Sequence, residues 1–203
     1  LDFYVFSASK YAIDAHMNDA ASGYFNVIFM PTSVINLAAG FVIRPFLTSL
    51  TDFWDRKRFR EFSGKLKQLS LVIGALTLVA VAGAAVLGRP VLALLEWLLG
   101  PVYAGKLTRY HGPFVWIVLG GGCYAVLNLY YYALVIMRRQ KTIFGIYLVL
   151  AVAGAVVAPR MVKHSGIQGA AAAYLVLMAV MAAGFAGLAW YGYRKTTAGR
   201  QAG

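Results

Sequence analysis

Polar side chains recur on one face of an otherwise apolar stretch of this sequence, residues 23–43, which carries no charge. On a helix that turns about 100° per residue, the small and polar residues of the stretch, together with the arginine that follows it, fall within an arc of roughly 80°. They are Asn26, Ser33, Asn36, Gly40 and Arg44. Such a stripe either hydrogen-bonds to water or a polar ligand in a cavity, or joins neighbouring helices through its amides.

A second stripe of the same kind lies in residues 113–137. Its members fall within an arc of about 100°, and they are Gly121, Tyr124, Asn128, Tyr131 and Arg138. Tyrosine offers a flat apolar face and a hydroxyl group, a combination that suits sugars. The same combination suits a membrane interface, and the adjacent tyrosines at 130–132 are also consistent with an interfacial belt.

Residues that could break or form bonds are not arranged for catalysis. His16, His111 and His164 are far apart in the sequence, and none has the spacing of a metal ligand. The sequence contains no serine nucleophile elbow and no pair of carboxylates inside an apolar stretch. We therefore expect a protein that holds or moves a ligand, is not an enzyme and needs no cofactor.

The elements that must position the two stripes are long apolar segments. About 20 uncharged helical residues span the ~30 Å hydrocarbon core of a bilayer. Five segments qualify as complete crossings: residues 23–43, 68–88, 113–137, 142–158 and 167–193. Residues 1–9 resemble the outer end of a helix whose beginning is missing, so we expect an amino-terminal truncation. We expect a connection over residues 10–22, a basic loop over 44–67, a short interfacial helix over 90–103 and a frayed tail from 196.

Composition and charge agree with an all-α, polytopic membrane protein forming one transmembrane domain over residues 1–203. The chain is 61% hydrophobic, with a mean hydropathy of +0.68. Its net charge of +12 comes from Lys and Arg between the apolar segments, which indicates topology and not nucleic-acid binding. With the 44–67 loop in the cytoplasm, thirteen Lys and Arg fall inside and six outside, and the carboxyl terminus is cytoplasmic. The lone Cys123 excludes an intrachain disulfide.

Glycines give a second structural signal. Gly120, Gly121 and Gly122 follow no strand and start no helix, so they are not a phosphate-binding loop. Close approach of neighbouring helices, or a flexible point, explains them better. Residues 68–88 and 167–193 are dominated by Ala, Val, Leu and Gly, and we expect them to pack against other helices.

Several short motifs, in order, resemble the bacterial polysaccharide flippases, also called oligosaccharide-unit translocases or lipopolysaccharide and capsule biosynthesis proteins. These belong to the multidrug/oligosaccharidyl-lipid/polysaccharide exporter superfamily. The motifs are Lys10-Tyr11-Ala12-Ile13-Asp14, Ile28-Phe29-Met30-Pro31, Asn36-Leu37, Arg44-Pro45, Met137-Arg138-Arg139-Gln140-Lys141 and Gly166-Ile167-Gln168-Gly169-Ala170-Ala171. Each is weakly specific alone. The resemblance covers nearly the whole chain and implies the second of two helical bundles around a central cavity, with the first bundle absent.

This resemblance implies flipping of polyprenyl-pyrophosphate-linked glycans across the bacterial cytoplasmic membrane for O-antigen, capsule or exopolysaccharide synthesis. The partners would be that lipid-linked glycan, membrane lipids, a polysaccharide polymerase and glycosyltransferases. The pyrophosphate would meet Arg44 first and Arg138 second, and Lys10 would act at the outer end. Asn26, Asn36, Asn128 and Tyr124 would line the glycan path. Both arginines also suit a purely topological role at the lipid headgroups.

Three other functions stay open at this point. A cation-coupled drug exporter of the same superfamily often needs an acidic residue within a span, and the five spans contain none. A lipid II flippase would differ in the identity of its cargo. A non-transporting assembly or anchoring subunit would need no wet cavity at all. A membrane glycosyltransferase is disfavoured because acidic catalytic loops are absent.

Overall fold

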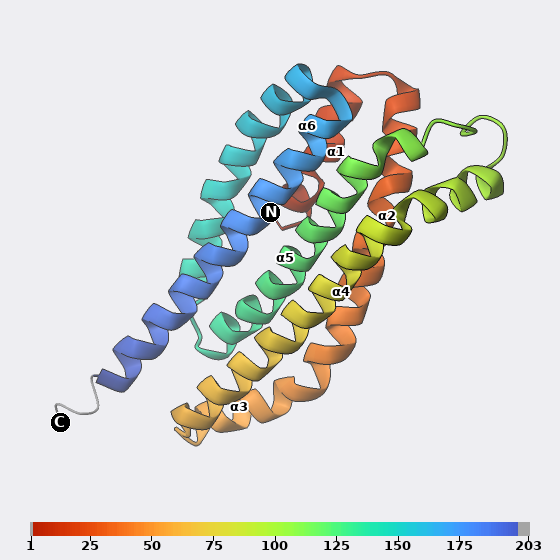
Figure 1. The fold of residues 1–203 in the computed structure, drawn as a ribbon. Helices are drawn as coiled ribbons and strands as arrows, with labels where there is room; N and C mark the ends of the chain where they lie inside the picture. The colour runs from red at the N-terminus through yellow and green to blue at the C-terminus, as the bar shows by residue number, and fades with distance from the viewer. Residues whose placement is uncertain (1, 199–203) are drawn as a thin grey trace.

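A computed structural model describes residues 2–198, and every regular element in that range is a helix. Figure 1 shows the long helices lying side by side in a bundle. The elements are α1 (Asp2–His16), α2 (Asp19–Ile43), the short 3-10 helix η1 (Arg44–Phe46), α3 (Leu47–Asp55), α4 (Phe59–Leu99), η2 (Thr108–Tyr110), α5 (His111–Ile136) and α6 (Gln140–Ala198). The all-α class expected from the sequence is confirmed.

Four helical segments within residues 2–198 are long and apolar enough to cross a membrane. They are Asp19–Asp55, Phe59–Leu99, Thr108–Ile136 and Gln140–Thr197. The last of them consists of two helices that meet at Gly166, where the backbone leaves helical geometry (φ 55°, ψ −131°). Figure 1 shows the chain reversing there, so α6 is a pair of antiparallel arms, 140–165 and 167–198.

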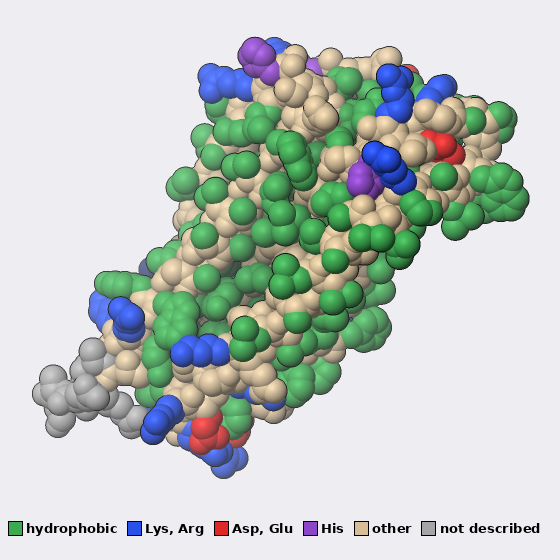
Figure 2. Space-filling view, viewed as in Figure 1, with side chains coloured by type: hydrophobic (Ala, Val, Ile, Leu, Met, Phe, Trp, Pro, Cys, Tyr) green, Lys and Arg blue, Asp and Glu red, His purple; other side chains and the backbone are tan. Residues whose placement is uncertain are grey.

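Charged side chains gather toward the two ends of the bundle, and hydrophobic side chains cover the region between them (Figure 2). Large apolar residues on α2 and α4 are exposed, among them Phe41 and Leu78, which are 72% and 70% exposed. Backbone groups of such helices are satisfied within each helix, which is the arrangement a bilayer requires. The distribution is compatible with a membrane protein.

Helix α4 corrects two sequence-based expectations. It begins at Phe59, inside the segment expected to be a loop, and it runs without a break past Gly88 to Leu99. The expected separate interfacial helix is therefore continuous with α4 through Pro90. A proline removes one ladder hydrogen bond and still allows helix to continue when packing supports it. That support comes from fully buried Leu92 and from Glu96, which accepts a hydrogen bond from the Thr108 backbone N–H at 2.7 Å.

Further corrections concern Pro159 and the segment before α2. The fourth predicted span was expected to end before Pro159, but the first arm of α6 continues through this proline as far as the turn at Gly166. Residues 10–16 belong to α1 and not to a connection, because Ala12 and Ile13 are buried and keep the apolar face of that helix intact. The expected frayed tail is helical up to 198, and the rest of it lies outside the described residues.

The three consecutive glycines of α5 each face a different helix. A Cβ on Gly120 would lie 2.7 Å from the ring of Tyr174 in α6. One on Gly121 would lie 3.5 Å from the Cα of Thr32 in α2, and one on Gly122 would lie 2.0 Å from a methyl carbon of Thr77 in α4. The predicted close approach of helices is confirmed at these positions, and α5 is the central helix of the bundle.

Candidate ligand-binding cavity

The two polar stripes meet where α2 faces α5. Asn128 Nδ2 donates a hydrogen bond of 2.9 Å to Asn36 Oδ1, and both side chains are half-buried. A cavity of about 320 Å³ opens beside this amide pair. Residues of α1, α2 and α5, together with the first residue of η1, line it: Phe6, Ser33, Asn36, Leu37, Ala39, Gly40, Ile43, Arg44, Asn128 and Tyr132.

Arg44 supplies the positive charge of this cavity. It follows the last residue of α2, and its side chain is exposed. A Cβ on Gly40 would lie 3.7 Å from Arg44 Nε, so the arginine side chain passes over the glycine one turn earlier in the chain. Arg44 makes no ion pair with any described residue, which leaves its guanidinium free to bind an anion at the rim of the cavity.

A second, larger cavity adjoins the first. Its volume is about 680 Å³, and it shares Asn128 and Tyr132 with the first cavity. Aromatic residues dominate its walls, which are formed by Asn128, Tyr131, Tyr132, Val135, Gln140, Ile143, Phe144 and Tyr147. The two cavities place amide, hydroxyl and aromatic groups next to one cation, the combination of groups that recognises a hydroxyl-rich anion.

Four residues predicted for the site lie elsewhere. Asn26 is exposed and lines neither cavity, because ten residues separate it from Asn36, a rise of about 15 Å along the helix. Tyr124 is buried, with its ring centroid 4.7 Å from that of Phe6. Lys10 is half-buried in α1, and its ammonium lies 5.6 Å from the centroid of the Phe29 ring.

Arg138 is the fourth of these residues. It lies in the turn between α5 and α6, is exposed, and lines neither cavity. Its backbone has φ 58°, the left-handed conformation that often ends a helix. The hydrogen bond from Arg139 N–H to Leu134 C=O, 3.0 Å long, closes this turn. The reason for its position is that α5 ends at Ile136, before the polar stripe reaches residue 138.

Sequence reasoning missed several lining residues. Tyr132 is one helical turn beyond Asn128, so the spacing of the second stripe could have included it. Phe6 comes from α1, and no local pattern connects it with α2 or α5. Tyr147 and Phe144 come from the first arm of α6, where no polar stripe points to a ligand site.

Comparison with known protein families, curated proteins and solved structures found no match to this chain. Asn36, Asn128 and Arg44 surround one cavity, and their part in ligand binding stays a prediction.

Proposed function

We propose that this chain is one transmembrane bundle of a flippase that moves polyprenyl-pyrophosphate-linked oligosaccharides across the bacterial cytoplasmic membrane. The single observation that carries the proposal is the unpaired Arg44 at the rim of a cavity that also contains the Asn36–Asn128 amide pair. A polar cavity of this kind, between helices with an apolar exterior, is typical of a pathway for a polar group through a membrane.

The chemistry of the cargo matches the chemistry of the cavities. A pyrophosphate and a glycan are both costly to place in hydrocarbon, because their charges and hydroxyl groups would lose hydration without compensation. Arg44 can form two parallel hydrogen bonds with a phosphate group. The amides of Asn36 and Asn128 and the hydroxyls of Tyr131 and Tyr132 offer hydrogen bonds to sugar hydroxyls, while the aromatic faces cover the apolar faces of the sugar rings.

In this proposal α2, α4, α5 and both arms of α6 cross the membrane completely, and α1 packs against them. The end that carries the basic residues 56–67 faces the cytoplasm, as does the carboxyl terminus. A second bundle then covers the side of α2 on which Asn26 and Ser33 are exposed. The product glycan would pass to a polysaccharide polymerase, and glycosyltransferases would supply the substrate.

Complementation of a strain that lacks the complete protein tests this function. Arg44→Ala is expected to reduce surface polysaccharide at least tenfold at unchanged membrane abundance, while Arg44→Lys retains part of it because the charge remains. Arg60→Ala is the matched control, since Arg60 is an exposed arginine of the same basic region and lines neither cavity. Wild-type polysaccharide levels with Arg44→Ala, or an equal loss with Arg60→Ala, would contradict the proposal.

Purified protein in vesicles separates transport from assembly. The complete protein is expected to move a fluorescent polyprenyl-pyrophosphate oligosaccharide between leaflets, and Arg44→Ala is expected to abolish that movement. Movement of lipid II together with no movement of the oligosaccharide lipid would assign the protein to the lipid II flippases instead. No movement of either lipid, with polysaccharide synthesis intact in cells, would assign it to non-transporting assembly subunits.

A further inference from the structure

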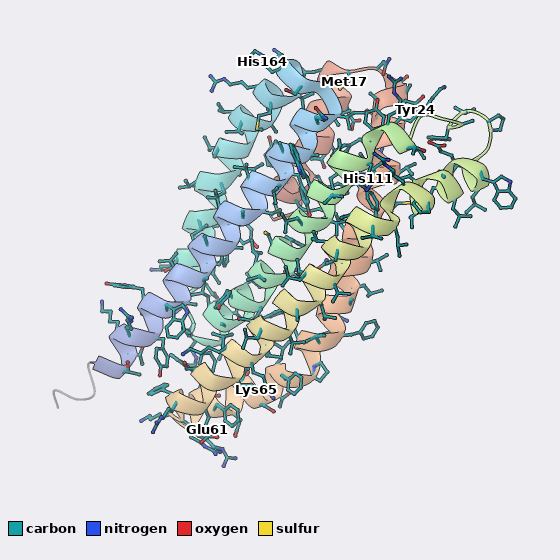
Figure 3. All side chains as sticks on the ribbon, viewed as in Figure 1. Met17, Tyr24, Glu61, Lys65, His111 and His164 are labelled. Carbon is teal, nitrogen blue, oxygen red and sulfur yellow. The ribbon has the colours of Figure 1, made fainter. Side chains whose placement is uncertain are left out.

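A separate pocket lies at the opposite end of the bundle from the basic region 56–67. Its volume is about 280 Å³. Its walls come from α5 and from both arms of α6, and they are Trp116, Arg160, Met161, His164, Ser165, Gln168, Gly169 and Ala172. Figure 3 places His164 at the far end of the bundle from Lys65 and Glu61. None of the cavity residues discussed above belongs to this pocket.

Gly169 lines the pocket at a point where the two arms of α6 contact each other. A Cβ on this residue would lie 1.9 Å from the backbone oxygen of Met161, so the two arms of α6 touch there through their backbones. This close approach follows the reversal at Gly166 and brings Gln168, from the second arm, beside residues of the first arm. The pocket is therefore built by the tertiary fold and is not a groove along a single helix.

An arginine and a histidine from one face of the first arm of α6 line the pocket. Arg160 and His164 are four residues apart, one helical turn, and therefore project in the same direction. Both are exposed, and neither has an ion-pair partner among the described residues. The lining contains no Asp or Glu. The pocket thus offers an arginine and an imidazole, with the Ser165 and Gln168 side chains as further hydrogen-bond donors.

The remaining lining suits the apolar part of a lipid. Trp116 is 44% exposed, and tryptophan favours the boundary between hydrocarbon and headgroups because its ring is apolar and its N–H is polar. Met161, Gly169 and Ala172 give the pocket apolar walls next to the polar side chains. A phospholipid would match both the polar and the apolar residues of the pocket, with its phosphodiester beside Arg160 and its glycerol ester beside Trp116.

We propose that this pocket binds the phosphate of an anionic phospholipid, with Arg160 as its main ligand and His164, Ser165 and Gln168 as hydrogen-bonding neighbours. The inference rests on that part of the proposed function which places the bundle in a membrane. It does not require the chain to transport anything. Free inorganic phosphate carries the same chemistry, and the experiment below separates the two sources.

Quenching of Trp116 fluorescence by brominated lipid tests the site. The protein is placed in phosphatidylcholine nanodiscs containing a small fraction of lipid brominated near the glycerol, either phosphatidylglycerol or phosphatidylcholine. Subtracting the signal of Trp116→Phe isolates this tryptophan. We expect the apparent affinity for the brominated phosphatidylglycerol to exceed that for the brominated phosphatidylcholine about fivefold, the effect of one cation near an anionic lipid.

Arg160→Gln is expected to abolish this preference. Lys163→Gln is the matched control, because Lys163 is an exposed cation of the same helical turn that does not line the pocket. An equal quench by the two lipids in the wild type would overturn the inference, as would an equal loss of preference with both variants. Failure of the protein to enter nanodiscs at all would instead count against the membrane placement.

Salt distinguishes the source of the phosphate. Sodium phosphate and sodium chloride of equal ionic strength should lower the preference equally if the site binds the lipid headgroup much more tightly than free phosphate, since screening then acts alone. A larger loss of the phosphatidylglycerol preference with sodium phosphate than with sodium chloride would show that free phosphate competes for the pocket, and would assign the site to the free anion.

Discussion

Asn128 in α5 donates a hydrogen bond of 2.9 Å to Asn36 in α2, across 92 residues of sequence. The bond serves two purposes in the proposed mechanism. It holds two helices together, and it places two amides at the wall of the cavity that contains Arg44. These two purposes can be separated by substitution.

Replacing either asparagine alone with leucine should lower stability more than replacing both. A single replacement leaves one amide without its partner, at a cost of about 1 kcal/mol for a bond between membrane helices. Asn36→Leu with Asn128→Leu removes both amides and should recover part of that loss. Thermal unfolding in detergent of the wild type, the two single variants and the double variant measures the coupling. Strictly additive losses would show that the amide bond contributes nothing.

Cysteines at the amide positions should react with water-soluble, charged thiol reagents. The background needs Cys123→Ser, because Cys123 is the native thiol. In that background, Asn36→Cys and Asn128→Cys are expected to be labelled in membranes, since both positions border the cavity. Leu127→Cys is the dry control, because Leu127 is fully buried beside Asn128. Labelling of 36 and 128 no faster than that of 127 would show a packed interface without water.

Glycine should stabilise two turns at the basic end of the bundle. Arg138 and Lys57 both have a left-handed backbone, with φ of 58° and 61°, and each turn is closed by a hydrogen bond from the following residue to a carbonyl five residues earlier. Glycine adopts this conformation without the steric cost of a Cβ, which is about 1 kcal/mol. Arg138→Gly and Lys57→Gly should therefore each raise the unfolding temperature.

Alanine at the same two positions gives the comparison. Arg138→Ala and Lys57→Ala remove the same charges and keep the Cβ, so they should leave the unfolding temperature close to that of the wild type. If glycine and alanine have the same effect, lost charge repulsion and not backbone conformation explains the change. The glycine variant also removes the Arg138 side chain without weakening the fold, which makes it the better test of any part for Arg138 in transport.

Alanine at Gly169 should destabilise the protein by about 3 kcal/mol or prevent its folding, because the two arms of α6 cannot separate without breaking their packing. Gly184→Ala is the matched control on the same helix. No atom lies within 4 Å of a Cβ there, so alanine should stabilise the helix by roughly 0.5–1 kcal/mol. The yield of folded protein and the unfolding temperature check both. A harmless Gly169→Ala would contradict the close contact at Met161.

Local patterns in the sequence predicted much of the fold. The uncharged run was predicted to end at Ile43, and α2 ends at that residue. The spacing of the two polar stripes placed Asn36 and Asn128 on polar helix faces, and these two faces contact each other. Periodicity could not show that α4 continues through Pro90, because burial of Leu92 by distant residues decides that. Nor could it assign Phe6 to the cavity, since its place depends on how α1 packs and not on its neighbours in the chain.

The glycine triplet of α5 has a consequence for the shape of the whole bundle. Consecutive residues of a helix project about 100° apart, so Gly120, Gly121 and Gly122 bring α6, α2 and α4 into contact with α5 at a single height. At ~1.5 Å per residue, Asn128 lies roughly 10 Å along α5 from this height, and both cavities border Asn128. Both cavities thus lie between the glycine triplet and the end of the bundle that carries the basic residues 56–67, so in the proposed orientation a substrate entering from the cytoplasm would reach the triplet before it could go further.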